Sequence, residues 1–588
     1  MFCLFYFLSK RVEKKGRLKM VDLKKIPYCL TEEQEKWVYD TLRSMSVEEK
    51  AGQLFCEIIN SDEEDDIERL FSKIKPGGLM FRPLTLEKTH AMIAHLQELS
   101  DIPMLIAGNL ERGGTGACLE GTYYGAPMQI AATDDDECAY RLGKIACAEG
   151  SALGFNWTFE PLLDIDYNPM SPITNTRTFG SDTDLIIRMA KGYMKGAHEE
   201  GCAVTCKHWP GDGMDFRDQH MCSSVNTKTV EEWDATYGKN YKALIDSGCD
   251  TIMAAHIRLP EYSKLLNPSL KDEEILPGSL SYELTTTLLR ERLGFNGMVV
   301  SDATQMAGFT EFLPRRQAVP ASIAAGVDMF LFTICYEEDV NYMLEGIKEG
   351  IITPERLDEA VTRILGIKAK LNLYKKKVEG ALQLPLEEAR AVIGSAIHKK
   401  YAEDCADKAV TLVKNKNKVI PLSLERQKRI LFRVVNNEAP KENVYDGPTK
   451  LFRDLLVQEG FEVTDFSDDH VPCKNVNTFS IESMKQSFDL MVYVVNVGFL
   501  GGSRFNRIQW KMGMQYDVPK FSSEIPVVMV SLYNPYHLMD AQMVQGYINC
   551  YSPTEENVKA VIEKLMGRSP FKGKSPVDAF CGLWDTRL

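Results

Sequence analysis

The chain has 588 residues, of which 44% are hydrophobic and 26% are charged, and its formal net charge is -14. A chain of this length exceeds what one hydrophobic core ordinarily covers, so we expect two or more domains. The negative charge disfavours a nucleic-acid partner, because binding a polyanion requires clustered lysine and arginine.

The N-terminal residues and the cysteines indicate in which cellular compartment the protein is expected. Residues 1–8 are apolar and basic residues follow them, the reverse of a secretion signal, and eight residues cannot cross a bilayer. We therefore expect residues 1–29 to be an extension without membrane association, with Met20 as the natural start; a weak membrane anchor is the alternative. The 15 cysteines are scattered and odd in number, which favours free thiols in a reducing compartment and predicts a cytoplasmic protein.

Residues 30–373 alternate between short, apolar, β-rich runs and amphipathic helical patterns. Two of the helical patterns, at 185–200 and 282–293, stop at Gly201 and Gly294. The apolar runs lie at 78–81, 103–109, 155–160, 203–208, 251–256, 297–302 and 329–332. Strands that alternate with helices pair in parallel, so this region is predicted to be an α/β fold, a (β/α)8 TIM-type barrel.

A different organisation follows the predicted barrel. Residues 374–400 are charged and helical, without an apolar strand, and are predicted to form a linker. Residues 401–588 predict a second α/β domain, an open-sheet sandwich with helices on both faces. Its expected strands lie at 409–413, 429–435, 489–497, 526–532 and 546–551, and its expected helices lie at 449–459 and 556–566.

Polar side chains end several of the predicted barrel strands. In a barrel of this type, the active site lies at the carboxyl ends of the strands. Every strand must end at some polar residue, but the convergence of six such residues favours an active site: Asn109, Glu160, Lys207, His208, His256 and Asp302.

The loop at 207–220 holds one lysine, two histidines, three aspartates and one arginine, and three interpretations are open. His208, His220 and an aspartate could bind a metal ion, although Lys207 would place a cation beside it. Asp218 could instead hold one nitrogen of His220, which leaves the other nitrogen to exchange protons near neutral pH. In the third interpretation, both histidines are structural and cap neighbouring loops.

A second informative segment spans residues 276–306, and in it Asp302 directly follows the apolar run at 298–301. A carboxylate at a barrel mouth can act as a nucleophile if neighbouring cations keep it ionised. An aspartate at a strand end is otherwise commonly the N-cap of the next helix. The local pattern leaves both roles open.

Together these two segments resemble glycoside hydrolase family 3, in its β-N-acetylglucosaminidase branch. Residues 207–220 are similar to the branch motif K-H-F-P-G-H-G-x-x-x-x-D-S-H, and residues 294–302 are similar to G-F-x-G-x-x-x-S-D. The resemblance extends over about residues 30–588. It implies that Asp302 is the catalytic nucleophile and that His220, held by Asp218, is the general acid/base.

The resemblance also implies a set of substrate-binding residues: Lys207, His208, Arg177, Asn109 and Glu111, with His256 in a subsite or behind it. The chain departs from the family pattern at Asp212, where histidine is usual, and at Gln219, where serine is usual. Asn109 replaces a usual aspartate. Because an amide both donates and accepts hydrogen bonds, we expect sugar binding to survive there with an altered preference.

The implied activity is that of a retaining exo-glycosidase, a β-N-acetylhexosaminidase that removes terminal β-linked N-acetylglucosamine and needs no metal or organic cofactor. A neutral histidine does not repel an incoming anion, so phosphorolysis to a sugar 1-phosphate is an alternative. A β-glucosidase or β-xylosidase is another, although those relatives take their acid/base from a glutamate in the second domain. An inactive sugar-binding protein is the alternative from a different class. In each case the expected partner is a carbohydrate.

A glycine-containing segment at 498–510 follows the predicted strand at 489–497. Open α/β sheets place their functional loops at this edge. We expect the segment to form part of the substrate cleft, with Arg504 and Arg507 near the substrate. An exposed surface loop is the alternative.

Overall fold

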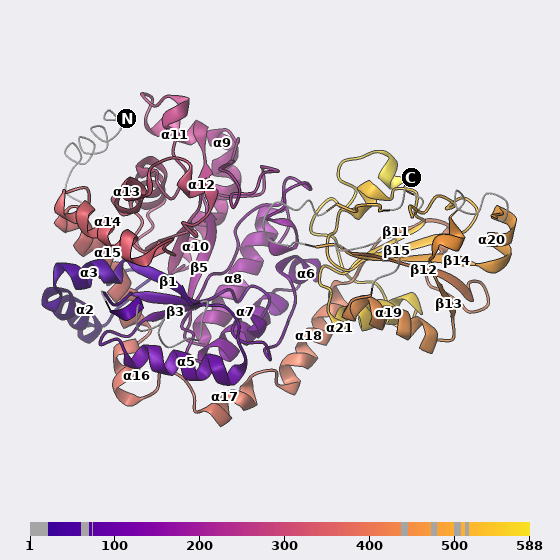
Figure 1. The fold of residues 1–588 in the computed structure, drawn as a ribbon, viewed down its shortest axis with the longest axis horizontal. Helices are drawn as coiled ribbons and strands as arrows, with labels where there is room; N and C mark the ends of the chain where they lie inside the picture. The colour runs from indigo at the N-terminus through magenta and orange to yellow at the C-terminus, as the bar shows by residue number, and fades with distance from the viewer. Residues whose placement is uncertain are drawn as a thin grey trace.

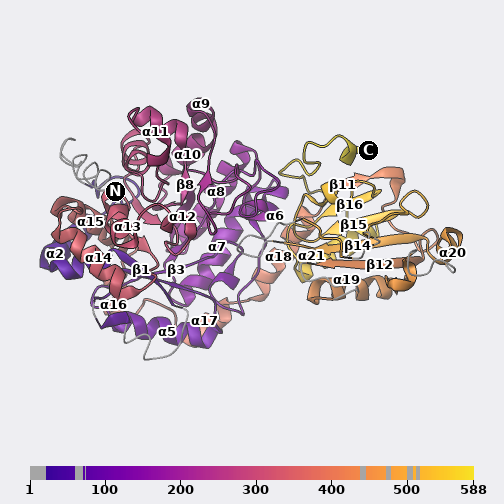
Figure 2. The same cartoon turned by 45° about the horizontal axis from the view of Figure 1, so that its top comes forward.

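The computed structural model describes residues 21–59, 70–72, 74–436, 445–471, 479–498, 507–511, 515 and 517–588. Two α/β domains lie side by side along the long axis of the molecule, with the N-terminal barrel on the left of Figure 1 and the C-terminal domain on the right. Helix α18 (Ala396–Ala409) lies between them in Figure 1 and in Figure 2.

Eight parallel strands form the barrel, in the order β10-β1-β2-β3-β4-β5-β7-β9. They are β1 (Phe55–Ile59), β2 (Gly78–Phe81), β3 (Leu105–Gly108), β4 (Trp157–Thr158), β5 (Ala203–Trp209), β7 (Thr251–Ala254), β9 (Met298–Ser301) and β10 (Phe330–Leu331). A parallel bridge between Val300 and Met329 joins the two ends of this order, and Ser301 N donates to Met329 O at 2.9 Å. The ring of strands is nearly closed, and the predicted fold class is confirmed.

Each of the seven predicted runs overlaps one barrel strand, but β1 was missed. Its sequence, Phe-Cys-Glu-Ile-Ile, is interrupted by Glu57, which is 4% exposed. The Glu57 carboxylate accepts hydrogen bonds from the backbone N and the hydroxyl of Thr333, at 3.3 and 2.7 Å. Because these partners lie 276 residues away, hydropathy alone could not show that the glutamate is buried.

Helices cover the outside of the barrel, and α8 (Thr183–Glu199) shows why they form. Asp182 caps its N-terminus by accepting a hydrogen bond from Leu185 N at 2.8 Å, and its apolar face packs against α7. The others are α2 (Glu32–Ser44), α3 (Val47–Gln53), α5 (Leu86–Glu98), α6 (Pro127–Ala132), α7 (Asp136–Ala152), α9 (Val230–Trp233), α10 (Lys239–Asp246), α11 (Pro260–Leu266), α12 (Ala307–Thr310), α13 (Arg315–Ala325), α14 (Tyr336–Lys348) and α15 (Pro354–Lys370), with π-helical turns η3 (Asp234–Gly238) and η5 (Glu283–Arg292). The loops add a short parallel pair, β6 (Ser224–Val225) and β8 (Ile257–Arg258), and 3₁₀ turns η1 (Gly114–Gly116), η2 (Asn175–Arg177) and η4 (Asp272–Glu274).

Three helices lead from the barrel to the second domain: α16 (Leu373–Glu379), α17 (Leu386–Val392) and α18. Within the predicted linker, α17 packs against α5 and α7. Buried Glu149, on α7, accepts a hydrogen bond from Gly394 N at 3.1 Å and lies 2.7 Å from His398 Nδ1. The connecting segment is therefore anchored to the barrel.

The second domain is a six-stranded sheet in the order β11-β16-β15-β14-β12-β13, parallel except for the β11–β16 pair. Its strands are β11 (Thr411–Asn415), β12 (Arg429–Asn436), β13 (Glu462–Asp465), β14 (Leu490–Asn496), β15 (Val527–Ser531) and β16 (Gly546–Asn549). One face is covered by α18, α19 (Gly447–Gln458) and α21 (Glu555–Leu565), and the other by α20 (Ile481–Ser487) with loops. The 3₁₀ turns are η6 (Lys416–Lys418), η7 (Asp468–His470), η9 (His537–Asp540) and η10 (Asp585–Arg587).

The two domains meet beside the carboxyl ends of the barrel strands. Tyr536 Oη, in the loop after β15, donates to Asp166 Oδ2 at 2.6 Å, in the loop after β4. Ala126 N donates to Ser552 Oγ at 2.9 Å. The second domain therefore contacts loops that lead to the barrel mouth.

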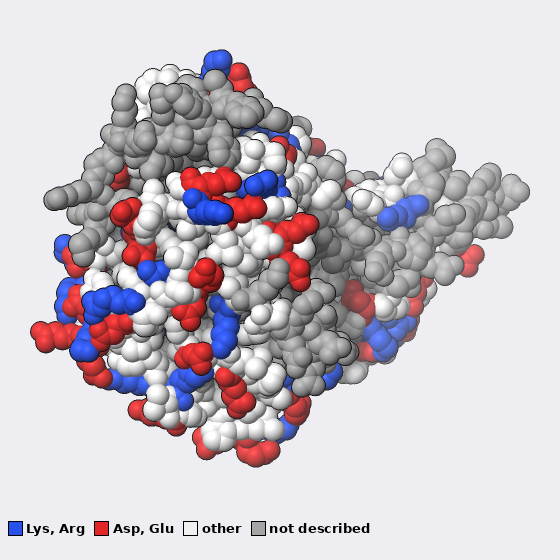
Figure 3. Space-filling view, turned by 60° about the vertical axis from the view of Figure 1, so that its left-hand side comes forward, with Lys and Arg blue, Asp and Glu red and all other residues white. Residues whose placement is uncertain are grey.

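Acidic and basic side chains are interspersed on the barrel face that Figure 3 shows. In the described ranges, no helix is both long enough and apolar enough to cross a membrane.

Candidate active site

A cavity of about 890 Å³ opens at the carboxyl ends of the barrel strands. Its wall includes residues on β5 and residues of the segments that follow β2, β3, β4, β5, β9 and β10. The volume suits a small-molecule ligand, because such sites span roughly 300–1,000 Å³. Seven of the residues predicted to form the site line this cavity: Asn109, Glu111, Arg177, Lys207, His208, His220 and Asp302.

Asp302 follows β9 and is 6% exposed. Its Oδ1 accepts a hydrogen bond from Ala303 N at 2.8 Å, while its Oδ2 has no hydrogen-bond partner among the described residues. Burial raises the pKa of this carboxyl, but the imidazoles of His208 and His256 help to hold it below its ordinary value. The next helix, α12, has Met306 as its N-cap, so the capping role does not apply. Asp302 is an ionised carboxylate with one oxygen available to a ligand.

His220 and Asp218 form a hydrogen-bonded pair. His220 Nδ1 lies 2.7 Å from Asp218 Oδ1, and the same oxygen accepts a hydrogen bond from His220 N at 2.8 Å. Burial lowers the pKa of the imidazole, but the buried Asp218 carboxylate outweighs burial and leaves that pKa raised. Because Asp218 holds Nδ1, Nε2 is the nitrogen that can exchange a proton with a ligand.

The segment after Asp302 holds the histidine loop in place. Ala307 N donates to His220 O at 3.2 Å, and Gly308 N donates to Gln219 O at 3.1 Å. A Cβ at position 308 would lie 2.8 Å from Gln219 O, so the close approach requires glycine. The candidate nucleophile and the candidate acid/base therefore lie on two loops that are bonded to each other.

The lowered pKa of Asp302 and the raised pKa of His220 predict a bell-shaped pH dependence of kcat/KM. If Asp302 acts as a nucleophile it must be ionised, and if His220 acts as an acid it must be protonated. The raised pKa of His220 keeps it protonated above its ordinary value of 6.5, so we expect the alkaline limb to lie above that pH. Asp218→Asn removes the carboxylate that raises this pKa and should move the limb to lower pH. The pH profile of aryl glycoside turnover measures the shift, and an unmoved limb would assign it to another group.

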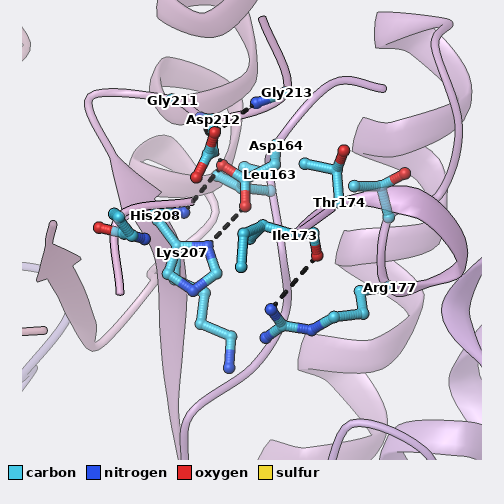
Figure 4. Close-up of polar contacts among 12 residues, drawn as sticks. Leu163, Asp164, Ile173, Thr174, Arg177, Lys207, His208, Gly211, Asp212 and Gly213 are labelled. Carbon is cyan, nitrogen blue, oxygen red and sulfur yellow. Dashed lines mark hydrogen bonds and ion pairs between the residues drawn. The ribbon is translucent and has the colours of Figure 1, made fainter. Parts of the chain in front are cut away.

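Lys207 and His208, on β5, are each bonded to a buried carboxylate. Lys207 Nζ donates to Glu160 Oε1 at 3.1 Å, and His208 Nδ1 lies 2.6 Å from Asp164 Oδ2. Figure 4 shows His208 beside Asp164, with the Lys207 and Arg177 side chains extending into the same space. Both predicted sugar-binding residues therefore have fixed orientations in the cavity wall.

Asp212, where the family motif has histidine, changes the surroundings of His208. Asp164 Oδ1 accepts hydrogen bonds from His208 N at 3.0 Å and from Asp212 N at 2.8 Å, which gathers both residues around one carboxylate (Figure 4). Burial and the adjacent Asp164 raise the pKa of the Asp212 carboxyl well above its ordinary value. Burial and Asp164 therefore favour the neutral form of the Asp212 carboxyl.

Glu111 and Arg177 form a bidentate ion pair on the cavity wall. Arg177 Nε lies 3.2 and 3.1 Å from the two Glu111 oxygens, and Nη2 lies 3.0 Å from Oε2. Burial raises the pKa of Glu111, but Arg177, Lys207 and Arg112 outweigh burial and lower it to about 2. Glu111 is therefore ionised and orients Arg177.

His256 does not line the cavity. It is fully buried, with Nδ1 2.9 Å from Ser279 Oγ and Nε2 3.0 Å from Ala303 O. Both ring nitrogens are engaged, so the residue supports the backbone beside Asp302 and is not positioned as a direct sugar ligand. Of the two locations that the resemblance implied, the structure places it behind the cavity wall.

Of the two arginines predicted to lie near the substrate in segment 498–510, the structure describes only Arg507. Arg504 lies outside the described residues. Arg507 donates from Nε to Asp540 Oδ1 at 2.7 Å and its Nη1 lies 3.7 Å from Met170 Sδ, in the barrel loop after β4. It therefore lies at the domain boundary and is not part of the cavity lining, in contrast to the expectation for this residue.

Three residues of the site were not predicted as such. Asp164, which holds His208, has no motif of its own. Arg112 lines the cavity next to Glu111, and its place in the glycine-containing segment 109–114 was the available signal. Tyr533, which bonds Arg112, comes from the second domain, and no local pattern indicates it.

No group of three or more histidine, cysteine, aspartate or glutamate side chains within the described ranges is arranged to hold a metal ion. The two histidines of the metal interpretation are bonded to different carboxylates, His208 to Asp164 and His220 to Asp218. Activity without a metal ion stays a prediction.

An ionised aspartate and a carboxylate-held histidine in one cavity of a (β/α)8 barrel supply the nucleophile and the proton donor that a retaining glycoside hydrolase needs. Residues 46–367 match the glycosyl hydrolase family 3 N-terminal domain, and the chain belongs to that family. It is 42% identical over 577 residues to the beta-N-acetylglucosaminidase/beta-glucosidase of Cellulomonas fimi, an alignment that covers 97% of this chain and 100% of the relative. The predicted family and enzyme class are confirmed.

Several solved structures resemble nearly the whole chain, and two of them bear on its activity and fold. The beta-glucoside phosphorylase BglX has a TM-score of 0.90 and 48% sequence identity, and the match covers 96% of this chain and 99% of the other. A family 3 beta-N-acetylglucosaminidase from Paenibacillus sp. has a TM-score of 0.76 and covers 92% of this chain and 100% of its own. At 21% identity, the second likeness supports the two-domain fold alone.

Proposed function

We propose that the enzyme removes terminal β-linked glucose or N-acetylglucosamine by double displacement and transfers the sugar to inorganic phosphate in preference to water. The observation that carries the proposal is the presence of Asp302 and the Asp218-held His220 on the wall of one cavity. The sugar range is supported by the Cellulomonas fimi relative, whose name joins both activities. The acceptor is supported by the beta-glucoside phosphorylase, at 48% identity over nearly the whole chain.

In the first step, the Asp302 carboxylate attacks the anomeric carbon as His220 Nε2 donates its proton to the departing aglycone oxygen. The bond between the carboxylate oxygen and C1 forms while the bond between C1 and the aglycone breaks, with inversion at C1. The step leaves a glycosyl ester on Asp302 and a neutral imidazole on His220.

In the second step, the acceptor attacks C1 from the face opposite the ester, and the carboxylate leaves with a second inversion. The imidazole accepts the proton of attacking water, whereas dianionic hydrogen phosphate attacks through an oxygen that is already negative. Being neutral at this stage, the imidazole does not repel phosphate, whereas an ionised carboxylate in its place would. Two inversions restore the β configuration, so the expected product is a β-configured sugar 1-phosphate.

Product analysis with and without phosphate tests the proposal. The substrates are nitrophenyl β-glucoside and nitrophenyl β-N-acetylglucosaminide. Their good leaving group speeds the first step, so that the second step limits the rate of turnover. We expect phosphate to accelerate nitrophenol release and to yield the β-sugar 1-phosphate from both substrates, as identified by phosphorus and proton NMR. Free sugar as the sole product at high phosphate would remove phosphate from the proposal, and turnover of one substrate alone would narrow the sugar range.

The remaining candidate functions have weaker support. A β-glucosidase that takes its acid/base from the second domain would leave the hydrogen-bonded His220–Asp218 pair without a role. An inactive sugar-binding protein would have no need for Asp302 as an ionised carboxylate with one unengaged oxygen. Turnover of either nitrophenyl substrate excludes the inactive protein.

A further inference from the structure

Four side chains with a permanent positive charge line the catalytic cavity: Arg82, Arg112, Arg177 and Lys207. Arg177 and Lys207 are each paired with a carboxylate, at 3.0 and 3.1 Å. Within the described ranges, neither Arg82 nor Arg112 has a carboxylate oxygen within 4.0 Å. The cavity wall therefore carries two positive charges that no described carboxylate neutralises at contact distance.

The topology carries these two charges on segments that follow neighbouring strands, on the side of the barrel away from the nucleophile. Arg82 follows β2 and Arg112 follows β3, and these strands pair with each other. In the order β10-β1-β2-β3-β4-β5-β7-β9, β3 lies four places from β9 in either direction around the ring. The segment that carries Arg112 therefore begins on the opposite side of the barrel from Asp302. An acceptor must approach C1 from the face opposite the Asp302 ester, so it meets the wall that carries both arginines.

Arg112 is oriented by the second domain. Its Nη2 donates to Tyr533 Oη, and its Cζ lies 5.3 Å from the centre of the Tyr533 ring. Tyr533 packs on Gly498, where a Cβ would come within 2.6 Å of the ring. Because a phenol is neutral near pH 7, it fixes the guanidinium without cancelling its charge. The charge remains available to an anionic ligand.

A hydroxyl donor lies beside Arg112. Gly113 and Tyr123 form an antiparallel bridge, and Tyr124 N donates to Arg112 O at 2.7 Å, so the two segments run next to each other. Tyr123 lines the cavity, and its Oη is buried without a hydrogen-bond partner among the described residues. Buried hydroxyls usually have a partner, and a ligand oxygen at this place would supply one.

We propose that Arg112 and Arg82, with the Tyr123 hydroxyl, bind the phosphate acceptor in the cavity. The inference rests on the proposed function, because it assigns the residues that hold phosphate for the second step. A guanidinium group matches phosphate through two parallel N–H···O bonds, and two arginines match its double negative charge. The same chemistry would bind a carboxylate on the aglycone, and the experiment below separates the two sources.

The kinetic arm measures phosphate dependence with the neutral nitrophenyl β-glucoside. Hydrogen bonds to charged groups are strong, so Arg112→Met should lower kcat/KM for phosphate about 10- to 100-fold and reduce phosphate-independent release far less. Arg82→Gln should also lower kcat/KM for phosphate. Because the Arg82 side chain is exposed, this substitution should leave the fold intact. Lys574→Gln is the matched control, because it removes a cation that bridges the domains to Asp134 at 2.9 Å, outside the cavity lining. Its phosphate dependence should equal that of the wild type.

Titration calorimetry with inorganic phosphate keeps this test separate from the proposed function. If the wild type yields only free sugar, the proposed acceptor fails, yet phosphate binding that is lost in Arg112→Met and Arg82→Gln supports the site. Absence of phosphate binding by the wild type, or equal binding by the wild type and both variants, overturns it. A loss confined to substrates with a carboxylated aglycone, with phosphate binding unchanged, also overturns it and assigns the arginines to the aglycone.

Discussion

Asp302→Ala should abolish turnover while the protein stays folded. Only two carboxylates are among the described residues that line the cavity, and Glu111 is committed to its ion pair with Arg177. Asp302 is therefore the one with an oxygen available to attack C1. Removal of a catalytic nucleophile typically lowers kcat by about 10⁴-fold or more. Release of nitrophenol measures the loss, and thermal unfolding establishes that the variant is folded.

Two further measurements distinguish a nucleophile from a positioning residue. A 2-deoxy-2-fluoro glycoside with a good leaving group should label the wild type on Asp302, because fluorine disfavours the positively charged transition state and slows release of the ester. Azide should restore turnover in Asp302→Ala and give the α-glycosyl azide, since a single displacement inverts C1. Glu111→Gln is the control and should still be labelled on Asp302. A label on Glu111, or a β-configured azide product, would contradict the assignment.

The barrel was predictable because its strands are covered on both faces and are apolar throughout. The same reasoning missed β1, where the buried Glu57 is hydrogen-bonded to Thr333, 276 residues further along the chain. It also missed β13, an edge strand whose residues are exposed or half-buried, so that its hydropathy resembles that of a loop. Hydropathy thus predicts a strand whose buried side chains are apolar. It fails for a strand in which a buried polar side chain is hydrogen-bonded to a residue distant in the sequence.

Within the site, contacts between residues near in sequence were predictable, and contacts made by the fold were not. Asp218 and His220 are two residues apart, so the hypothesis of a bonded pair needed only an extended loop. The choice between cap and nucleophile for Asp302 depended on where α12 begins. Arg112 is oriented by Tyr533, which lies 421 residues away in another domain, and no local pattern carries that information.

His220→Ala should slow substrates according to how much their leaving group needs a proton. A sugar or alkyl aglycone leaves as a strongly basic alkoxide unless an acid protonates it, whereas dinitrophenolate leaves readily without one. General acid/base catalysis contributes about 10²–10⁴-fold, so we expect a loss in kcat/KM of that size for a disaccharide and a much smaller loss for the dinitrophenyl glycoside. Comparison of the two substrate classes in one variant measures the difference.

The second step offers an independent check on the same residue. Water needs a base to lose its proton, but dianionic phosphate already carries a negative oxygen that can attack C1. With the dinitrophenyl substrate, His220→Ala should therefore lose hydrolysis and keep most of its acceleration by phosphate. Asp218→Asn, which keeps the imidazole but removes the carboxylate 2.7 Å from Nδ1, should fall between the wild type and His220→Ala. Equal losses on both substrate classes, together with equal losses for water and phosphate, would mean that His220 positions the sugar and transfers no proton.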